Sequence, residues 1–253
     1  MPSIVALTNG SPHSWIIINT VVARFGPITV LIEDPEPRWG LVRRRLKRHG
    51  PLALAGQIGF VVLRRFIAKR NQARLVEIIH EHGLDPSPHP DCEVVPIRSV
   101  NSPACREALA RLCPDVVFVI GTGIIRAETL QAIRVPLMNC HFGITPKYRG
   151  QAGGYWALAK GDPDHAGVTV HLVDAGVDTG EVIYQARFSA GERDSFSTYF
   201  YLQAAAFRAI TVKALEDALN GGLRPFKPSL PSEQFHHPTL WAYLRTGLSK
   251  GVW

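Results

Sequence analysis

The stretch Val135-Pro-Leu-Met-Asn-Cys-His-Phe-Gly-Ile-Thr-Pro-Lys-Tyr-Arg-Gly150 decides how the rest of the chain is interpreted. It opens with a short apolar run typical of a buried parallel strand, and the glycines and prolines that follow end regular structure. Asn139 and His141 are therefore predicted at the carboxyl end of this strand, with both side chains on one side and Cys140 on the other. This pair suits acyl transfer, because an amide can stabilise an oxyanion while an imidazole moves a proton.

A second stretch, Gly167-Val-Thr-Val-His-Leu-Val-Asp-Ala-Gly-Val-Asp-Thr-Gly-Glu-Val-Ile183, predicts an alternating strand, a tight loop and another strand beginning near Glu181. The loop offers a carboxylate, Asp178, as a partner for His141. Taken alone, an N-x-H pair also fits a histidine that bonds a loop backbone and an asparagine that caps a turn. The second stretch, with its carboxylate, favours a functional site over this structural alternative.

Together, N-x-H followed by G-x-x-P-x-Y-R-G, and then G-V-T-V-H with V-D-x-G, resembles the folate-dependent formyltransferase family over roughly residues 92 to 190. This family includes glycinamide ribonucleotide formyltransferase, the catalytic domain of methionyl-tRNA formyltransferase and the sugar N-formyltransferases. The resemblance implies an α/β fold, a Rossmann-like mostly parallel sheet with flanking helices. It also implies N10-formyltetrahydrofolate as co-substrate, Asn139, His141 and Asp178 as catalytic residues, and no metal.

The resemblance also implies where the folate binds. Residues 115–120 form the clearest buried parallel strand, and in the family the loop after it lies along the pterin, holding it largely by backbone groups. The candidate folate-binding residues are Gly121, Gly123, Ile124, Ile125 and, in the downstream loop, Asp174. The loop after 120 also fits a plain turn between a strand and a helix.

Residues of two other segments are candidates for binding the acceptor. The strand predicted at 4–8 runs into Asn9-Gly10-Ser11, and family members often use this first loop to hold the acceptor; its backbone amides could donate to a phosphate. Tyr148 and Arg149 follow the N-x-H segment. A tight turn without a ligand is the alternative for the first loop.

The bulk composition fits a soluble enzyme. The chain has 253 residues, 46% hydrophobic and 19% charged, and we expect a domain over 1–222 with an extension, 223–253, packed on it. Four cysteines without C-x-x-C spacing predict reduced thiols, and no basic stretch precedes the first strand, so a cytoplasmic location is expected. Methionyl-tRNA formyltransferases carry a separate C-terminal domain for tRNA, and we expect no such module here.

Residues 36–83 depart from the compact pattern of the family and predict a basic helical insertion. The net charge is +7, and 38–76 holds eleven Lys or Arg and no Asp or Glu. The apolar run 51–63 between the basic clusters is shorter than the roughly 20 residues a membrane-spanning helix needs. The segment could pack on the body or on a second subunit, lie through 41–70 on the inner face of an anionic membrane, or bind an anionic substrate or nucleic acid.

The acceptor is the least determined part of the prediction. An amino sugar on a nucleotide carrier is expected, with a lipid-linked or other small amine as the alternative, and water as acceptor would make a formyl-folate hydrolase. Outside this class, the chain could be a noncatalytic basic module that binds membrane or nucleic acid; a serine hydrolase is disfavoured because no G-x-S-x-G elbow is present. No nucleic-acid partner is expected, and a homo-oligomer is left open.

Overall fold

The computed structural model describes residues 1–35 and 38–253, and its centre is a seven-stranded sheet in the order β3-β2-β1-β4-β5-β7-β8. The first five of these run parallel, and β7 and β8 run antiparallel to their neighbours. The strands are β1 (Ile4–Thr8), β2 (Thr29–Glu33), β3 (Glu93–Ile97), β4 (Val116–Ile120), β5 (Leu137–His141), β7 (Gly167–Leu172) and β8 (Val182–Arg187). The α/β, mostly parallel architecture predicted from the sequence is confirmed.

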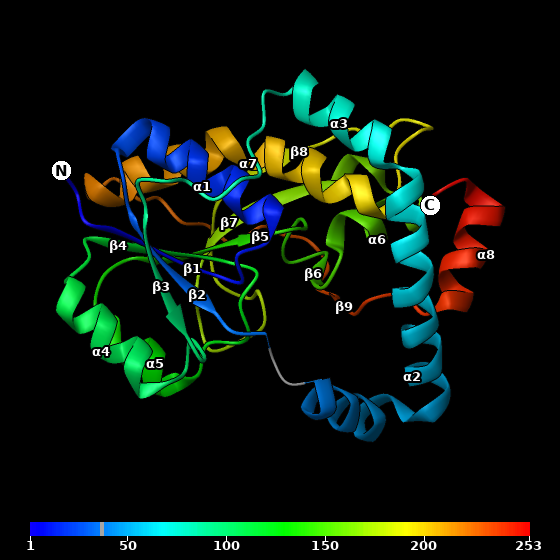
Figure 1. The fold of residues 1–253 in the computed structure, drawn as a ribbon, viewed down its shortest axis with the longest axis horizontal. Helices are drawn as coiled ribbons and strands as arrows, with labels where there is room; N and C mark the ends of the chain where they lie inside the picture. The colour runs from blue at the N-terminus through cyan, green and yellow to red at the C-terminus, as the bar shows by residue number, and fades with distance from the viewer. Residues whose placement is uncertain (36–37) are drawn as a thin grey trace.

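Helices cover both faces of the sheet (Figure 1). One face carries α1 (Pro12–Phe25) and α7 (Phe196–Leu219), with α3 (Gln72–Glu81) beyond them. The other face carries α4 (Pro103–Leu112) and α5 (Ala127–Ala132), and Ser102 caps the start of α4 because its side chain accepts from the Cys105 amide. The short α6 (Gly153–Ala159) follows the N-x-H segment.

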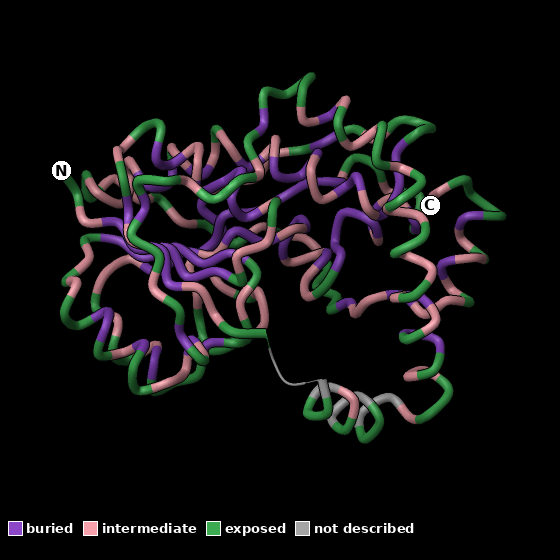
Figure 2. The backbone as a smooth tube through the Cα atoms, in the orientation of Figure 1, coloured by how far each residue is buried: buried purple, intermediate pink, exposed green. Residues whose placement is uncertain are grey.

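The central strands are buried on both faces, as Figure 2 shows. All five residues of β1 and of β4 are buried. Along β1, Ile4 and Ala6 belong to the cluster beneath α1 and α7, whereas Val5 and Leu7 belong to the cluster beneath α4 and α5. This alternation explains why the strands appear as continuous apolar runs in the sequence.

The predicted insertion is mainly one kinked helix, α2 (Arg38–Arg70), which changes direction at Gly50, where φ is 77°, immediately before Pro51. Residues 36 and 37, at its predicted start, lie outside the described residues. One sequence interpretation needs correction here. The helical part Gly50–Arg70 has 21 residues and is long and apolar enough to cross a membrane by length and composition. The sequence interpretation counted only the apolar run 51–63 and therefore found the segment too short to span a membrane. The helix itself continues past residue 63, through Arg64 and Arg65, to Arg70.

The C-terminal extension contains a helix, α8 (Leu240–Lys250), that the sequence did not predict, and a short strand, β9 (Gln234–Phe235), that pairs with β6 (Arg149–Gly150). α8 lies beside the second half of α2 (Figure 1). Tyr243 is its anchor, with no exposed surface and its ring 5.0 Å from that of Phe60 on α2. The extension therefore holds the insertion against the body.

Phe60 and Phe66 offer a matched test of how α2 is attached. Phe60 is 1% exposed and its ring lies 4.9 Å from that of Phe196 on α7, whereas Phe66 is 66% exposed on the same helix. Because a large buried side chain is lost, we expect Phe60→Ala to lower the free energy of unfolding by about 3–4 kcal/mol. Phe66→Ala should change it by less than about 0.5 kcal/mol. Urea unfolding measures both, and equal effects would contradict the packing described here.

Candidate active site

Asn139 and His141 are the third and fifth residues of β5, so the strand itself fixes their direction. The predicted alternation is present. Between them Cys140 is buried, and its Sγ lies 3.7 Å from the Thr211 Oγ1 on α7. The amide and the imidazole therefore point away from α7, at the carboxyl edge of the parallel strands, where α/β sheets bind ligands.

Asp178 joins this pair from the loop between β7 and β8. Its Oδ2 lies 3.3 Å from His141 Nδ1, and its Oδ1 accepts a hydrogen bond from Asn139 Nδ2 at 3.2 Å. The Gly150 amide donates to Oδ2 at 2.8 Å. The side chains are 5% exposed for His141 and 14% exposed for Asp178. The structure thus brings together the three residues expected from the sequence to be catalytic. Of Asp178 and His141, the carboxylate is the more exposed to solvent.

A fourth side chain, His171 of β7, completes the cluster and was not predicted. It lies opposite Asn139 in the antiparallel register. Its Nδ1 lies 2.7 Å from the carbonyl of Leu172, which can only accept, so its Nε2 accepts from Asn139 Nδ2 at 3.1 Å. The signal was present in G-V-T-V-H, because alternation places Thr169 and His171 on one face of a hairpin. Both amide hydrogens of Asn139 are consequently engaged, one by His171 and one by Asp178.

The protonation states follow from burial and from these partners. Burial lowers the pKa of His141, and this effect exceeds the opposing effect of Asp178. Burial raises the pKa of Asp178, but His141, His171 and the Gly150 amide outweigh it and hold that pKa well below its usual range. His141 Nε2 donates to the Tyr148 carbonyl at 2.8 Å, so a proton taken up by the ring is held at Nδ1, facing the Asp178 carboxylate.

Tyr148 and Arg149, predicted to contact the acceptor, hold the site together instead. Tyr148 is 2% exposed and its hydroxyl donates to Asp162, so a substrate contact through its phenol is not supported. Arg149 donates from Nη1 to the Val177 carbonyl at 2.7 Å and from Nε to the Ser232 hydroxyl at 2.9 Å. It thereby ties the loop that carries Asp178 to the C-terminal extension.

The first loop differs from its prediction in one respect. The amides of Gly10 and Ser11 donate to the side chains of Thr8 and Asn9, both at 3.1 Å, so they are not free to bind a phosphate. The Asn9 side chain faces Gly121, since a Cβ at that glycine would lie 3.1 Å from Asn9 Nδ2. The loops predicted to hold acceptor and folate are therefore neighbours, and Gly121, with φ of 70°, allows their close approach.

Glu33 and Asn101 shape the predicted folate loop, and neither was predicted. Glu33, the last residue of β2, accepts from the Gly123 amide at 2.8 Å and from the Val100 amide at 2.9 Å. Asn101 donates to the Ile124 carbonyl at 2.8 Å. The Ile124 side chain is 65% exposed, whereas Ile125 is buried in the core. Of the two isoleucines proposed to line a pterin, only Ile124 presents its side chain to solvent.

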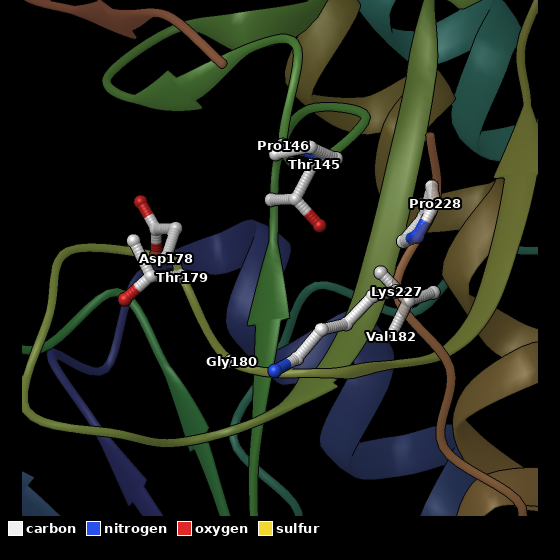
Figure 3. A pocket seen from close by; sticks show the side chains of 8 residues that line it. All are labelled: Thr145, Pro146, Asp178, Thr179, Gly180, Val182, Lys227 and Pro228. Atoms are coloured by element: carbon white, nitrogen blue, oxygen red, sulfur yellow. The ribbon is translucent and has the colours of Figure 1, made fainter. Parts of the chain in front are cut away.

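Asp174 acts within its own loop. Its Oδ1 accepts from the Gly176 amide at 3.0 Å and from the Thr179 hydroxyl at 2.7 Å, which fixes the turn that presents Asp178. A cavity of about 200 Å³ reaches this turn (Figure 3). Its lining residues are Thr145, Pro146, Asp178, Thr179, Gly180, Val182, Lys227 and Pro228.

Comparison with known proteins agrees with this geometry. The family model described as formyl transferase matches residues 68–214, which is more than half of the chain. The chain belongs to the formyl transferase family. A methionyl-tRNA formyltransferase of Synechocystis sp. is 33% identical over 140 residues, covering 54% of this chain and 42% of the relative. The corresponding protein of Synechococcus sp. is 30% identical over 151 residues, covering 56% and 47%. The chain thus spans less than half the length of these relatives.

Solved structures share the fold along most of the chain. A sugar N-formyltransferase from Shewanella sp. has a TM-score of 0.60 and 13% identity, covering 100% of this chain and 90% of that one. Glycinamide ribonucleotide transformylase 1 from Symbiobacterium toebii has a TM-score of 0.58 and 21% identity, covering 90% and 95%. An N-formyltransferase from Helicobacter canadensis, in complex with folinic acid and dTDP-3-aminofucose, has a TM-score of 0.56 and 16% identity, covering 93% and 71%.

The protonation state of His141 can be measured directly. Because its pKa is lowered from 6.5, its ring should be neutral at pH 6.5 and should take up a proton only in more acidic solution. Asp178→Asn should lower the pKa of His141 further, since it removes the charge that opposes burial. NMR titration of the histidine ring protons, with His141→Gln to assign the signal, checks both. A His141 titration above pH 6.5 would show that the ion pair outweighs burial.

Proposed function

We propose that this protein transfers a formyl group from N10-formyltetrahydrofolate to a primary amine, most specifically the amine of an amino sugar on a nucleotide carrier. The observation that carries the proposal is the convergence of Asn139, His141 and Asp178 at the carboxyl edge of the sheet, in a chain of the formyl transferase family. These groups supply an amide donor, a neutral imidazole and an ionised carboxylate within one hydrogen-bonded cluster.

The reaction requires one proton to move and one oxyanion to be stabilised. The amine nitrogen attacks the formyl carbon, a C–N bond forms, and the carbonyl electron pair moves to oxygen. Collapse of this intermediate breaks the bond to N10 of the folate, and the proton lost by the amine must reach N10. The pair of His141 Nδ1 and Asp178 Oδ2, 3.3 Å apart, can hold that proton between the two steps.

Asn139 would stabilise the oxyanion by exchanging partners. In the structure one of its amide hydrogens bonds Asp178 Oδ1 at 3.2 Å and the other bonds His171. The formyl oxygen would take over the hydrogen that points to Asp178, because Asp178 is the more exposed partner, 14% against 3% for His171, and it keeps the Gly150 amide as a donor. His171 would thereby act as a positioning residue that keeps the Asn139 amide oriented.

The folate would lie along the loop that follows β4. Ile124 presents an exposed apolar side chain there, and Glu33 and Asn101 hold the loop backbone from neighbouring strands. One fold neighbour, the N-formyltransferase of H. canadensis, was solved in complex with folinic acid, which supports a folate ligand for this architecture. The Asp174 turn would form the other side of this binding region.

An anionic carrier on the acceptor is supported by a cation beside the first loop. Arg64 of α2 is half-buried, and together with burial it lowers the pKa of His13 to about 4. No carboxylate among the described residues pairs with Arg64. A cation that has no carboxylate partner within residues 1–35 and 38–253, close to the loop predicted to hold the acceptor, suits a nucleotide diphosphate. The neighbour bound to dTDP-3-aminofucose shares this overall fold.

Substitution of the cluster tests the mechanism. We expect His141→Gln and Asp178→Asn each to lower kcat for formyl transfer by about a hundredfold or more, because each removes a group that acts on the proton or its carrier. His89→Gln and Asp91→Asn, at the opposite edge of the sheet, are matched controls and should leave the rate unchanged. The rate is measured by using chromatography to follow the formation of tetrahydrofolate. Full turnover in either cluster variant would overturn the mechanism.

The acceptor is tested by competition between amines. The purified protein is given formyl-folate with dTDP-linked and UDP-linked amino sugars, glycinamide ribonucleotide, initiator methionyl-tRNA, or water alone. We expect mass spectrometry to find one added formyl group on an amino-sugar nucleotide, and Arg64→Gln to raise KM for it more than it lowers kcat. Formylation of the tRNA alone, or release of formate without an amine, would replace the proposed acceptor while retaining the chemistry.

A further inference from the structure

The second half of α2 carries an exposed apolar stripe, which we name the outer stripe: Leu52, Ala55, Ile58, Val62 and Phe66. Their spacing of three or four residues places them on one side of the helix. The side chains of Leu52, Ile58, Val62 and Phe66 are 75, 51, 49 and 66% exposed. In the most apolar window of this helix only 17% of residues are buried. A run of exposed apolar side chains of this length is unusual on a free surface.

The opposite side of the same helix is fixed to the body, so the direction of the outer stripe is settled. Gly56, Gln57 and Phe60 are buried. α8 approaches so closely that a Cβ at Gly56 would lie 2.9 Å from Nε1 of Trp241. Trp241 is itself 55% exposed and therefore adds an aromatic side chain beside the start of the stripe.

Cations continue the outer stripe at its C-terminal end. Arg65, Lys69 and Arg70 are exposed and, by helical spacing, lie on the same side as Val62 and Phe66. No carboxylate of residues 1–35 and 38–253 pairs with these three side chains. Between 38 and 76 the sequence contains no Asp or Glu at all. The surface thus combines apolar side chains, a tryptophan and unpaired positive charge.

We propose that the outer stripe docks on the surface of an anionic lipid bilayer, with α2 lying in the plane of the interface. Apolar side chains would enter the acyl boundary, Trp241 would lie at the headgroups, and the cations would contact lipid phosphates. This inference does not rest on the proposed formyl transfer, because the catalytic cluster contributes no residue to the surface.

Three alternatives fit the observations less well. A second copy of this chain would bring two cationic faces together without a carboxylate to separate them, which costs energy at an interface. A helix that crosses the bilayer would have to leave the body, although Phe60 anchors it between Phe196 and Tyr243. Nucleic acid would use the cations but would leave the apolar side chains in water.

The test is flotation of the full-length protein with vesicles. We expect it to float with vesicles of phosphatidylcholine mixed with phosphatidylglycerol, to bind pure phosphatidylcholine far less, and to be released progressively as salt is raised. The charge variant Arg65→Gln, Lys69→Gln, Arg70→Gln should bind anionic vesicles about a hundredfold more weakly, since each cation near a charged bilayer contributes about fivefold and the three factors multiply.

Matched controls separate the surface from general effects. Arg98→Gln, Arg111→Gln, Arg134→Gln removes the same charge from exposed positions away from α2 and should keep most of the binding. Phe66→Ser should weaken binding severalfold, whereas Val94→Ser, on the exposed edge strand β3, should not. Thermal melting shows that each variant is folded.

Three results would overturn the proposal. The wild-type protein could fail to float with anionic vesicles at low salt. It could form a dimer, measured by analytical ultracentrifugation, that Phe66→Ser dissolves while vesicle binding is absent. It could also resist extraction from the vesicles by alkaline carbonate, which would identify a spanning helix in place of an interfacial one. None of these results depends on formyl transfer, so failure here and failure of the proposed enzyme activity are distinguishable.

Discussion

The candidate site depends on one carboxylate that is desolvated and kept ionised. Asp178 accepts from the Gly150 amide and from Asn139, and it faces two imidazoles, His141 at 3.3 Å and His171 at 3.6 Å. A buried carboxylate without such partners would take up a proton. The donors come from β5, from β7 and from the segment after β5. The carboxylate can therefore stay charged in its buried position only when the sheet and its edge loops are assembled, which couples the chemistry to the fold.

Several features of the surrounding chain serve to present this carboxylate. Asp174 closes the turn that carries it, and Arg149 ties the preceding residue, Val177, to the C-terminal extension. Close packing beneath the imidazole requires glycine: a Cβ at Gly143 would lie 2.8 Å from His141 Nε2 and 2.4 Å from the Tyr148 carbonyl. The G-x-x-P-x-Y-R-G motif is thus a structural support. Its tyrosine and arginine hold the site in place, and a pattern of residue types alone does not distinguish such a support from a substrate contact.

The features that could be predicted from the sequence are those that depend on local residue patterns. β1 and β4 are continuous apolar runs, and alternation along β5 separated Asn139 and His141 from Cys140 correctly. The sequence could not predict what depends on distant partners. The role of His171 follows from the register between β5 and β7. The role of Glu33 follows from the three groups that donate to it from other loops, two backbone amides and one hydroxyl. The protonation of His141 depends on burial, which opposes its carboxylate. α8 was missed because only two of its eleven residues, Tyr243 and Gly247, are buried.

The insertion illustrates why length alone does not decide how a helix meets a membrane. By composition, Gly50–Arg70 resembles a spanning segment, yet its inner side is occupied by α7 and α8. The run 51–63 is apolar on most of its sides and packed along one, so it must expose the remainder, which ends in three cations that no carboxylate of the described residues pairs. The proposed bilayer surface would satisfy both properties, the apolar side chains at the acyl boundary and the cations at the lipid phosphates. Arg64 of the same helix lies close enough to His13, after the first loop, to lower its pKa, so in the two proposals one element would contact a bilayer on its outer side and a substrate through Arg64.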